Sequence, residues 1–204
     1  KQFSRWLQCA SIGLEHLNKQ EKIRTMFSLE DLLEKRLDIA ERTALFKQFD
    51  SDNQFIKSVL RLAIEEDKSN KFLLFWYLDN YFYQNEEAFL NWKSAWIEAL
   101  RQVQYYGSKR SILRILAKKK RPYNEEEAGL LIDFSINHLE DRFETVAVHA
   151  SCMRLLEQFI PTYPELGAHI KLIIAEHVDA TVAFRARAKA LLRVVERVSR
   201  ASKH

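Results

Sequence analysis

Two segments of this chain carry basic side chains at a spacing that gathers positive charge on one face of a helix. Most neighbours in each row are three or four residues apart, and on a helix this interval places them one above another, opposite the apolar residues between them. The first row, between residues 108 and 121, consists of Arg110, Arg114, Lys118 and Arg121. The second row, between residues 182 and 200, consists of Arg185, Lys189, Arg193 and Arg200.

The charge around both rows is one-sided. Residues 101–121 contain eight basic residues and no acidic one, and residues 182–204 contain seven basic residues and one glutamate, although the whole chain has a net charge of only +4. Clustered positive charge favours an anionic partner, which can be an acidic protein segment or nucleic acid. Two helix faces that are merely exposed to water would show the same pattern, so both interpretations stay open.

Motifs for catalysis or metal binding are missing from the sequence. The four glycines are scattered, so they form no phosphate-binding loop. Two cysteines, Cys9 and Cys152, make neither a disulfide framework nor a zinc ligand cluster. His149 and Cys152 share a helix face, which would suit a thiolate–imidazole pair, but we interpret them as a core-flanking histidine beside a buried cysteine. We therefore expect no catalytic residue, no cofactor and no metal.

Composition indicates that the elements carrying these residues are helices. The 204 residues include four glycines and three prolines, where average usage would give roughly 14 and 10, so few residues suit β-turns. The segments are rich in Leu, Ala, Glu, Lys and Arg, which favour helices. Residues that can cap a helix N-terminus precede several amphipathic segments, namely Ser28, Asn53, Asn70, Asn85, Ser108 and Asn124. The chain is predicted to be all-α.

The predicted helices recur in pairs. We expect them at residues 53–66 with 70–83, 86–104 with 108–120, 124–139 with 143–160, and 164–179 with 182–199. The second helices begin at intervals of roughly 35 to 40 residues, close to the period of two-helix HEAT repeats. Residues 111–116 (SILRIL) and 151–156 (SCMRLL) echo each other and contain Arg114 and Arg154. These features predict a right-handed α-α superhelix of antiparallel helix pairs.

This pattern resembles that of HEAT-like repeat proteins. More narrowly, residues 28–193 are similar to a family of small bacterial helical-repeat proteins, some of which carry the name adenylosuccinate lyase. The similar stretches are residues 147–150 (AVHA), 163–166 (YPEL) and 184–192 (FRARAKALL). True lyases of that name contain a mobile loop with two prolines, and the three prolines of this chain form nothing like it. The resemblance therefore implies a helical-repeat fold without lyase activity.

In such a stack the second helix of each pair lines the concave side. The two basic rows would then run parallel on one concave wall and form an anion-attracting groove. Glu144 and Glu157, on the helix between them, are the acids expected to balance these rows if the charges are structural. We predict a non-enzymatic binding module for an acidic protein segment or nucleic acid, with the binding residues Arg110, Arg114, Lys118, Arg121, Arg154, Arg185, Lys189 and Arg193.

An enzymatic alternative rests on the aromatic stretch 72–83. Trp76 and Asp79 lie three residues apart in it, and DNA-alkylation-repair glycosylases also use HEAT-like repeats, with tryptophans and an aspartate lining a basic groove. That resemblance implies a base-handling site. Packing of Trp76 with Trp92 and Trp96 between neighbouring helices is the simpler interpretation, and we favour it.

We expect residues 28–204 to form one repeat domain and residues 1–27 to be an extension or capping helix. The apolar stretch 72–83 is too short to cross a bilayer and is interrupted by Asp79, so no membrane partner is expected. The low cysteine content fits a reducing cytoplasm.

Overall fold

A computed structural model describes residues 27–34, 36–68, 72–118 and 121–201. Within these ranges the chain forms ten α-helices and no β-strand, which confirms the predicted all-α solenoid class. The predicted N-terminal segment, apart from Phe27, and the predicted cap Asn70 lie outside the described residues. The chain divides into two compact units, residues 1–65 and residues 66–204.

The described part of the first unit contains three helices, α2 (Leu29–Glu34), α3 (Ile39–Ser51) and α4 (Asn53–Glu65). Helix α3 starts at a capping box, in which the Asp38 carboxylate accepts a hydrogen bond from Glu41 N at 2.8 Å and the Glu41 carboxylate accepts one from Asp38 N at 2.9 Å. Leu45, Phe49 and Val59 are buried between these helices. None of the predicted binding residues lies in this unit.

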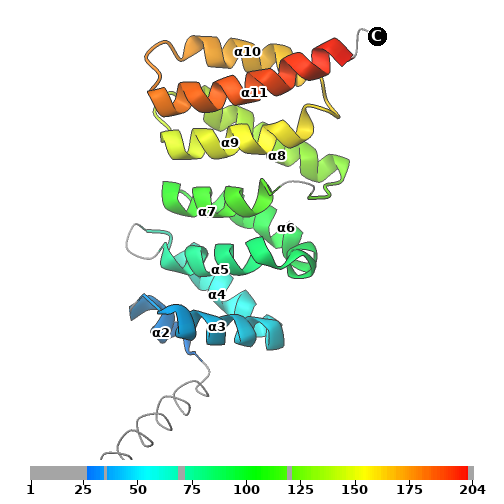
Figure 1. The fold of residues 1–204 in the computed structure, drawn as a ribbon. Coiled ribbons are helices and arrows are strands. Elements are labelled where there is room, and N and C mark those ends of the chain that lie inside the picture. The colour runs from blue at the N-terminus through cyan, green and yellow to red at the C-terminus, as the bar shows by residue number, and fades with distance from the viewer. Residues whose placement is uncertain (1–26, 35, 69–71, 119–120, 202–204) are drawn as a thin grey trace, which may run out of the picture. The chain divides into compact units, whose positions relative to one another are not determined.

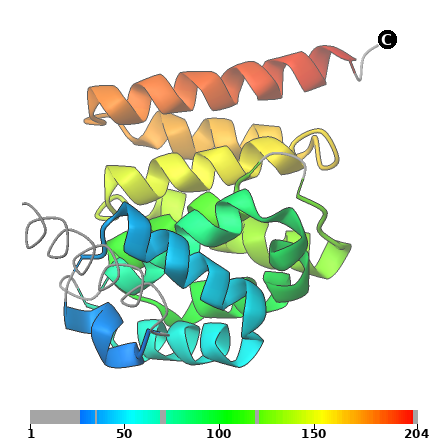
Figure 2. The ribbon, with the colours of Figure 1, turned by 60° about the horizontal axis from the view of Figure 1, so that its bottom comes forward.

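The described part of the second unit contains seven helices arranged in two layers (Figure 1). Four of them pack in sequence on one another and form what we call the second-helix layer: α5 (Leu73–Gln84), α7 (Tyr106–Leu116), α9 (Val146–Phe159) and α11 (Val182–Ala201). The other three form the first-helix layer: α6 (Glu86–Gln102), α8 (Glu125–Glu140) and α10 (Leu166–Glu176). In Figure 2 the red α11 runs alongside the orange α10, as expected for an antiparallel pair. The predicted pairs α6–α7, α8–α9 and α10–α11 are therefore found within this unit, whereas the predicted pair 53–66 with 70–83 is divided between the two units.

Local signals explain where some of these helices begin. Asn124 caps α8 as predicted, because its side chain accepts a hydrogen bond from Glu127 N at 2.8 Å and the Glu127 carboxylate accepts one from Asn124 N at 2.9 Å. Asn85 was expected to cap α6, but its side-chain amide donates to Tyr81 O at the end of α5 instead. Helix α7 starts at Tyr106, before the predicted cap Ser108, whose side chain is buried. In the short turn between α5 and α6, the Asn85 side chain therefore caps the C-terminus of α5 instead of the N-terminus of α6.

The two layers meet in an apolar core. Trp96 of α6 is fully buried and packs edge-on against Phe82 of α5, with ring centroids 5.1 Å apart. Trp92 contacts the same ring at 6.2 Å. These two tryptophans therefore pack between α5 and α6 with Phe82 as the partner ring, and Trp76 packs edge-on against Tyr77.

Two glycines in the first-helix layer give a test of this packing. A Cβ atom at Gly167 of α10 would lie 2.6 Å from Val195 Cγ1 of α11, whereas a Cβ at Gly129 of α8 would meet nothing within 4 Å. We expect Gly167→Ala to destabilise the fold by about 1–3 kcal/mol through overpacking. Gly129→Ala should stabilise it by about 0.5–1 kcal/mol by restricting the unfolded chain.

Thermal unfolding followed by circular dichroism compares the two variants. An unchanged melting temperature in Gly167→Ala would contradict the close approach of α10 to α11.

Candidate functional site

The two predicted basic rows lie on different surfaces of the second-helix layer. Arg114 points back to α5, where its Nη1 atom lies 2.6 Å from Asp79 Oδ2. Arg185, Lys189 and Arg193 line a groove shared with α10, on the other side of α11 from Arg187, which pairs with α9. Residues two positions apart on a helix, such as Arg185 and Arg187, differ by about 200° around the axis. The expected pair of parallel rows on one wall is therefore not found.

The first row ties α7 and the segment after it to the C-terminal end of α5. Lys118 Nζ donates to Tyr83 O at 2.7 Å, and Arg121 Nη2 donates to Phe82 O at 3.1 Å. Both cations also approach the Glu86 carboxylate, at 3.6 Å and 3.0 Å. The carbonyl groups at a helix C-terminus carry partial negative charge, so two cations stabilise this end. These contacts give the row a structural role.

Arg121 is the largest departure from the predicted exposed row. Its side chain is 0% exposed, and its guanidinium lies 3.6 Å from the centre of the Phe89 ring. Helix α7 ends at Leu116, so Arg121 does not continue the spacing of Arg110 and Arg114. Burial lowers the pKa of Arg121, and the Glu86 carboxylate opposes that shift. Arg121 therefore belongs to the core, in contrast to our expectation.

The acids expected to balance the rows have other partners. Glu144 accepts a hydrogen bond from Lys109 Nζ at 3.0 Å, and Glu157 Oε2 lies 2.6 Å from Arg187 Nη2. For the α7 row, Asp79 and Glu86 take the role that we expected for Glu144 and Glu157. The α7 row is thus part of a set of ion pairs between successive second helices.

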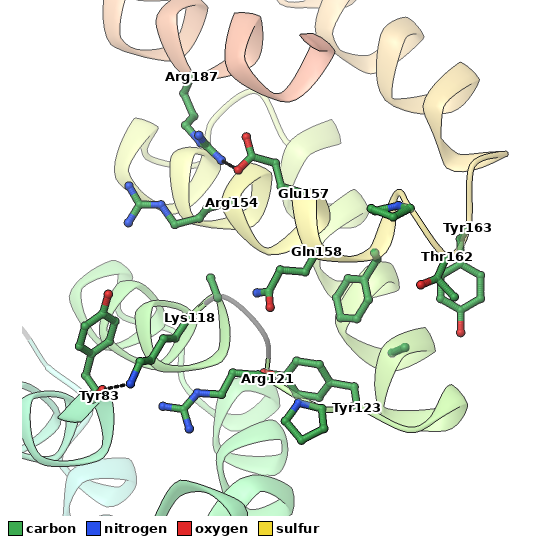
Figure 3. A pocket seen from close by; sticks show the side chains of 15 residues that line it. Tyr83, Lys118, Arg121, Tyr123, Arg154, Glu157, Gln158, Thr162, Tyr163 and Arg187 are labelled. Carbon is green, nitrogen blue, oxygen red and sulfur yellow. Dashed lines mark hydrogen bonds and ion pairs between the residues drawn. The ribbon is translucent and has the colours of Figure 1, made fainter. Parts of the chain in front are cut away.

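An open hollow of about 960 Å³ lies on the face of the second-helix layer (Figure 3). We call it the basic hollow, because it brings together Lys118, Arg121, Arg154 and Arg187 with one acidic residue, Glu157. The ends of α5 and α7 and the α9 and α11 helices surround it. The remaining lining residues are mainly aromatic, small or neutral: Tyr83, Ala117, Pro122, Tyr123, Ala128, Gln158, Phe159, Pro161, Thr162 and Tyr163.

Arg154 is the accessible cation of the basic hollow. It projects from the exposed side of α9 and has no ion-pair partner among the described residues. Arg187, which was not among the predicted residues, is held by Glu157 on the α11 side of the hollow. In the sequence, Arg187 is distinguished only by its position between Ala186 and Ala188, beside the apolar face of α11.

A second cavity, of about 470 Å³, lies between α5 and α7, and we call it the aromatic cavity. It brings Trp76 and Asp79 together with Arg110 and Arg114, and its other lining residues are Phe72, Asn80, Tyr105, Tyr106, Gly107 and Ser111. Burial raises the pKa of Asp79 to about 6, against the opposing effects of Arg114 and Arg110. The Oδ1 atom of Asp79 has no hydrogen-bond partner within the described part of the chain.

His149 and Cys152 are core residues, as we interpreted them. His149 Nε2 lies 3.0 Å from Asp141 O, and burial lowers the pKa of this imidazole. Burial also raises the pKa of the Cys152 thiol to about 12. A thiol with this pKa is almost wholly protonated at neutral pH, so the pair does not supply a thiolate nucleophile.

The described residues contain no group of three or more His, Cys, Asp or Glu side chains that could hold a metal ion. Of the helices in the described ranges, none is both long and apolar enough to cross a membrane.

Comparison with known proteins defines the class of this chain. Residues 29–194 match the HEAT repeat domain family, and the chain belongs to that family. No curated protein and no solved structure matches it. The narrower resemblance to bacterial proteins named adenylosuccinate lyase finds no support in these comparisons.

Proposed function

We propose that this HEAT repeat protein is a non-enzymatic binding module that holds an acidic segment of a partner protein in the basic hollow. Membership of the HEAT repeat family supports a scaffold or binding role. The observation that carries the proposal is the position of Arg154, an exposed cation in a hollow on the second-helix layer that has no ion-pair partner among the residues the structure describes. A reducing compartment such as the cytoplasm suits the buried free thiol of Cys152.

The charge in the basic hollow selects an anion. Glu157 is paired with Arg187, and Lys118 donates a hydrogen bond to Tyr83 O. Arg154 is therefore the cation in the hollow that is most available to bind a carboxylate. An arginine can bind a carboxylate through two parallel hydrogen bonds, which adds orientation to charge attraction. A second carboxylate of the same segment would approach Lys118, which is part-buried but still reachable from the hollow.

The lining favours a protein segment over nucleic acid. Nucleic-acid binding depends on many phosphate contacts, made by cations that follow the backbone. Here the α7 row is engaged with α5, and the α11 row lies in another groove, so the described residues form no continuous exposed row across the hollow. The rings of Tyr123 and Phe159 instead offer contact for an apolar side chain next to the acids.

Charge reversal at Arg154 tests the proposal. We expect Arg154→Glu to weaken the binding of a labelled Glu-rich peptide containing one Leu by about tenfold, because one charge-assisted contact becomes a repulsion. Fluorescence anisotropy at low and physiological salt measures the affinity. The matched control is Arg101→Glu, an exposed residue of α6 in the other layer, which should leave the affinity unchanged.

Equal affinities of the wild type and Arg154→Glu would refute the site. Tighter binding of a single-stranded oligonucleotide than of the peptide, with the same dependence on Arg154, would replace the protein partner by nucleic acid.

A second candidate function is supported by the aromatic cavity. Trp76 and Asp79 share this cavity with Arg114, which is the aromatic-plus-carboxylate arrangement suggested by the resemblance to DNA-alkylation-repair glycosylases. Such an enzyme would release the methylated base from duplex DNA, and Asp79→Asn would abolish the release. Absence of base release by the wild-type chain removes this candidate.

A further inference from the structure

We propose that α10 and α11 form a second docking surface, which binds an acidic amphipathic helix of a partner protein. The surface is a groove of about 460 Å³ along these two helices, and we call it the end groove. Ile174 and Leu192 provide its half-buried apolar part, above the buried side chains of Phe184 and Ala188. Arg185, Lys189 and Arg193 follow one another along its edge at successive turns of α11.

The end groove lies where the two layers have no further described helix. Helix α9 lies between α7 and α11, and α8 lies between α6 and α10. Helix α11 packs on α9 and α10, with Arg187 on its α9 side, and the groove occupies the opposite side. Figure 1 shows α10 and α11 at the end of the second unit, with no described helix beyond them. A docked helix would cover α10 and α11 as these cover α8 and α9.

Apolar surface on the same two helices suits such a helix. Ile174 of α10 and Leu192 of α11 are half-buried in the groove, so each presents part of its apolar surface to a bound helix. An amphipathic helix binds in a groove by burying apolar side chains spaced three and four residues apart. The groove therefore offers the apolar contact that this binding mode needs.

The charges show which helix fits. At the internal junctions of the second-helix layer, an acid of one helix meets a base of the next, as in the pairs Asp79–Arg114 and Glu157–Arg187. In the end groove, Lys189 and Arg193 meet no acid among the described residues, and Glu196 is the one acid that lines it. A partner that complements these basic side chains would carry acidic residues one helical turn apart.

A docked helix would supply these acidic residues with the right spacing. Four residues of helix rise by about 6 Å, so Glu or Asp at every fourth position matches the spacing of Arg185, Lys189 and Arg193. A second copy of this chain fits less well, because a two-fold contact would place the basic row against itself. We therefore assign the groove to an acidic amphipathic helix of a partner protein.

The test uses the full chain and a labelled peptide of about five helical turns, with Leu on one face and Glu at every fourth position beside it. Its control is a peptide of the same composition in scrambled order. We expect the wild type to bind the amphipathic peptide at least about tenfold more tightly than the scrambled one, and Lys189→Glu with Arg193→Glu to weaken binding by about a hundredfold. Arg61→Glu with Arg101→Glu, which changes the charge equally at exposed positions elsewhere, should leave the affinity unchanged.

Two further variants keep the test decisive. Leu192→Ser should weaken binding by removing apolar contact. If Lys189→Glu with Arg193→Glu alters the circular dichroism spectrum, the neutral variant Lys189→Gln with Arg193→Gln is used in its place. Arg154→Glu should not affect this peptide, so failure at the end groove is distinguishable from failure at the basic hollow. Equal affinity of both peptides, or of the wild type and the charge-reversed variant, would overturn the proposal. So would a wild-type dimer, detected by sedimentation, that dissociates in the charge-reversed variant.

Discussion

Replacement of Arg121 by alanine is expected to lower the free energy of unfolding by about 3 kcal/mol, since a buried charged hydrogen bond and the packing of the side chain are both lost. The guanidinium donates to Phe82 O and stacks on Phe89, and its side chain is fully buried. The ion pair with Glu86 contributes little to this value, because Glu86 is half exposed and can be hydrated again.

Urea denaturation followed by circular dichroism measures this loss. Arg101→Ala, at an exposed site on α6, serves as the control and should change stability by less than about 0.5 kcal/mol. Because the Arg121 side chain is not accessible, the folded variant should still bind the Glu-rich peptide. A stable Arg121→Ala variant that has lost peptide binding would instead return Arg121 to the binding site.

Charge reversal at Arg114 is the second large effect. Arg114→Glu should lower the free energy of unfolding by about 3 kcal/mol, because the buried Asp79 carboxyl loses its cation and faces a second acid. Asp79→Asn in the same chain should restore most of the loss, since the repulsion disappears. Our sequence analysis placed Arg114 among the binding residues, whereas its pairing with Asp79 gives it a structural role.

The pH dependence of stability checks the same pair. Burial raises the pKa of Asp79 from its usual 3.8 to about 6. Between these two values the folded chain keeps a proton that the unfolded chain has released, so the contribution of Asp79 to stability falls as the pH rises from about 4 to 6. Asp79→Asn should remove this part of the slope. An identical pH profile for Asp79→Asn and the wild type would show that Asp79 does not titrate in this range.

The helix pairs could be predicted from the sequence because their signals are local. Asn124 and the acids after it mark the start of α8, and the apolar spacing within each segment marks the buried face. The orientation of the basic rows could not be predicted in the same way. That orientation depends on which neighbouring helix each side of α11 contacts. Arg185 and Arg187 are only two residues apart, yet Arg185 lines the end groove and Arg187 pairs with Glu157 of α9.

The candidate site shows the same division between local and distant information. The segments of Arg154 and Arg114 echo each other in the sequence, yet the first residue is exposed and the second is paired with Asp79. An aspartate that interrupts the apolar stretch 72–83 was visible in the sequence, but its partner lies 35 residues further on. Arg121 was predicted to be exposed because it continues the three- and four-residue spacing of the basic row in the sequence. Helix α7 ends at Leu116, so this spacing does not place Arg121 on the same helix face.

A charge exchange between protein and peptide tests the central claim, that Arg154 receives a carboxylate of the bound segment. Variants of the Glu-rich peptide, each with one Glu replaced by Lys, are titrated into the wild type and into Arg154→Glu. The account predicts one peptide position at which Lys weakens binding to the wild type by about tenfold and restores binding to Arg154→Glu by a similar factor. Additive losses at every position, with no restoration at any of them, would contradict the account.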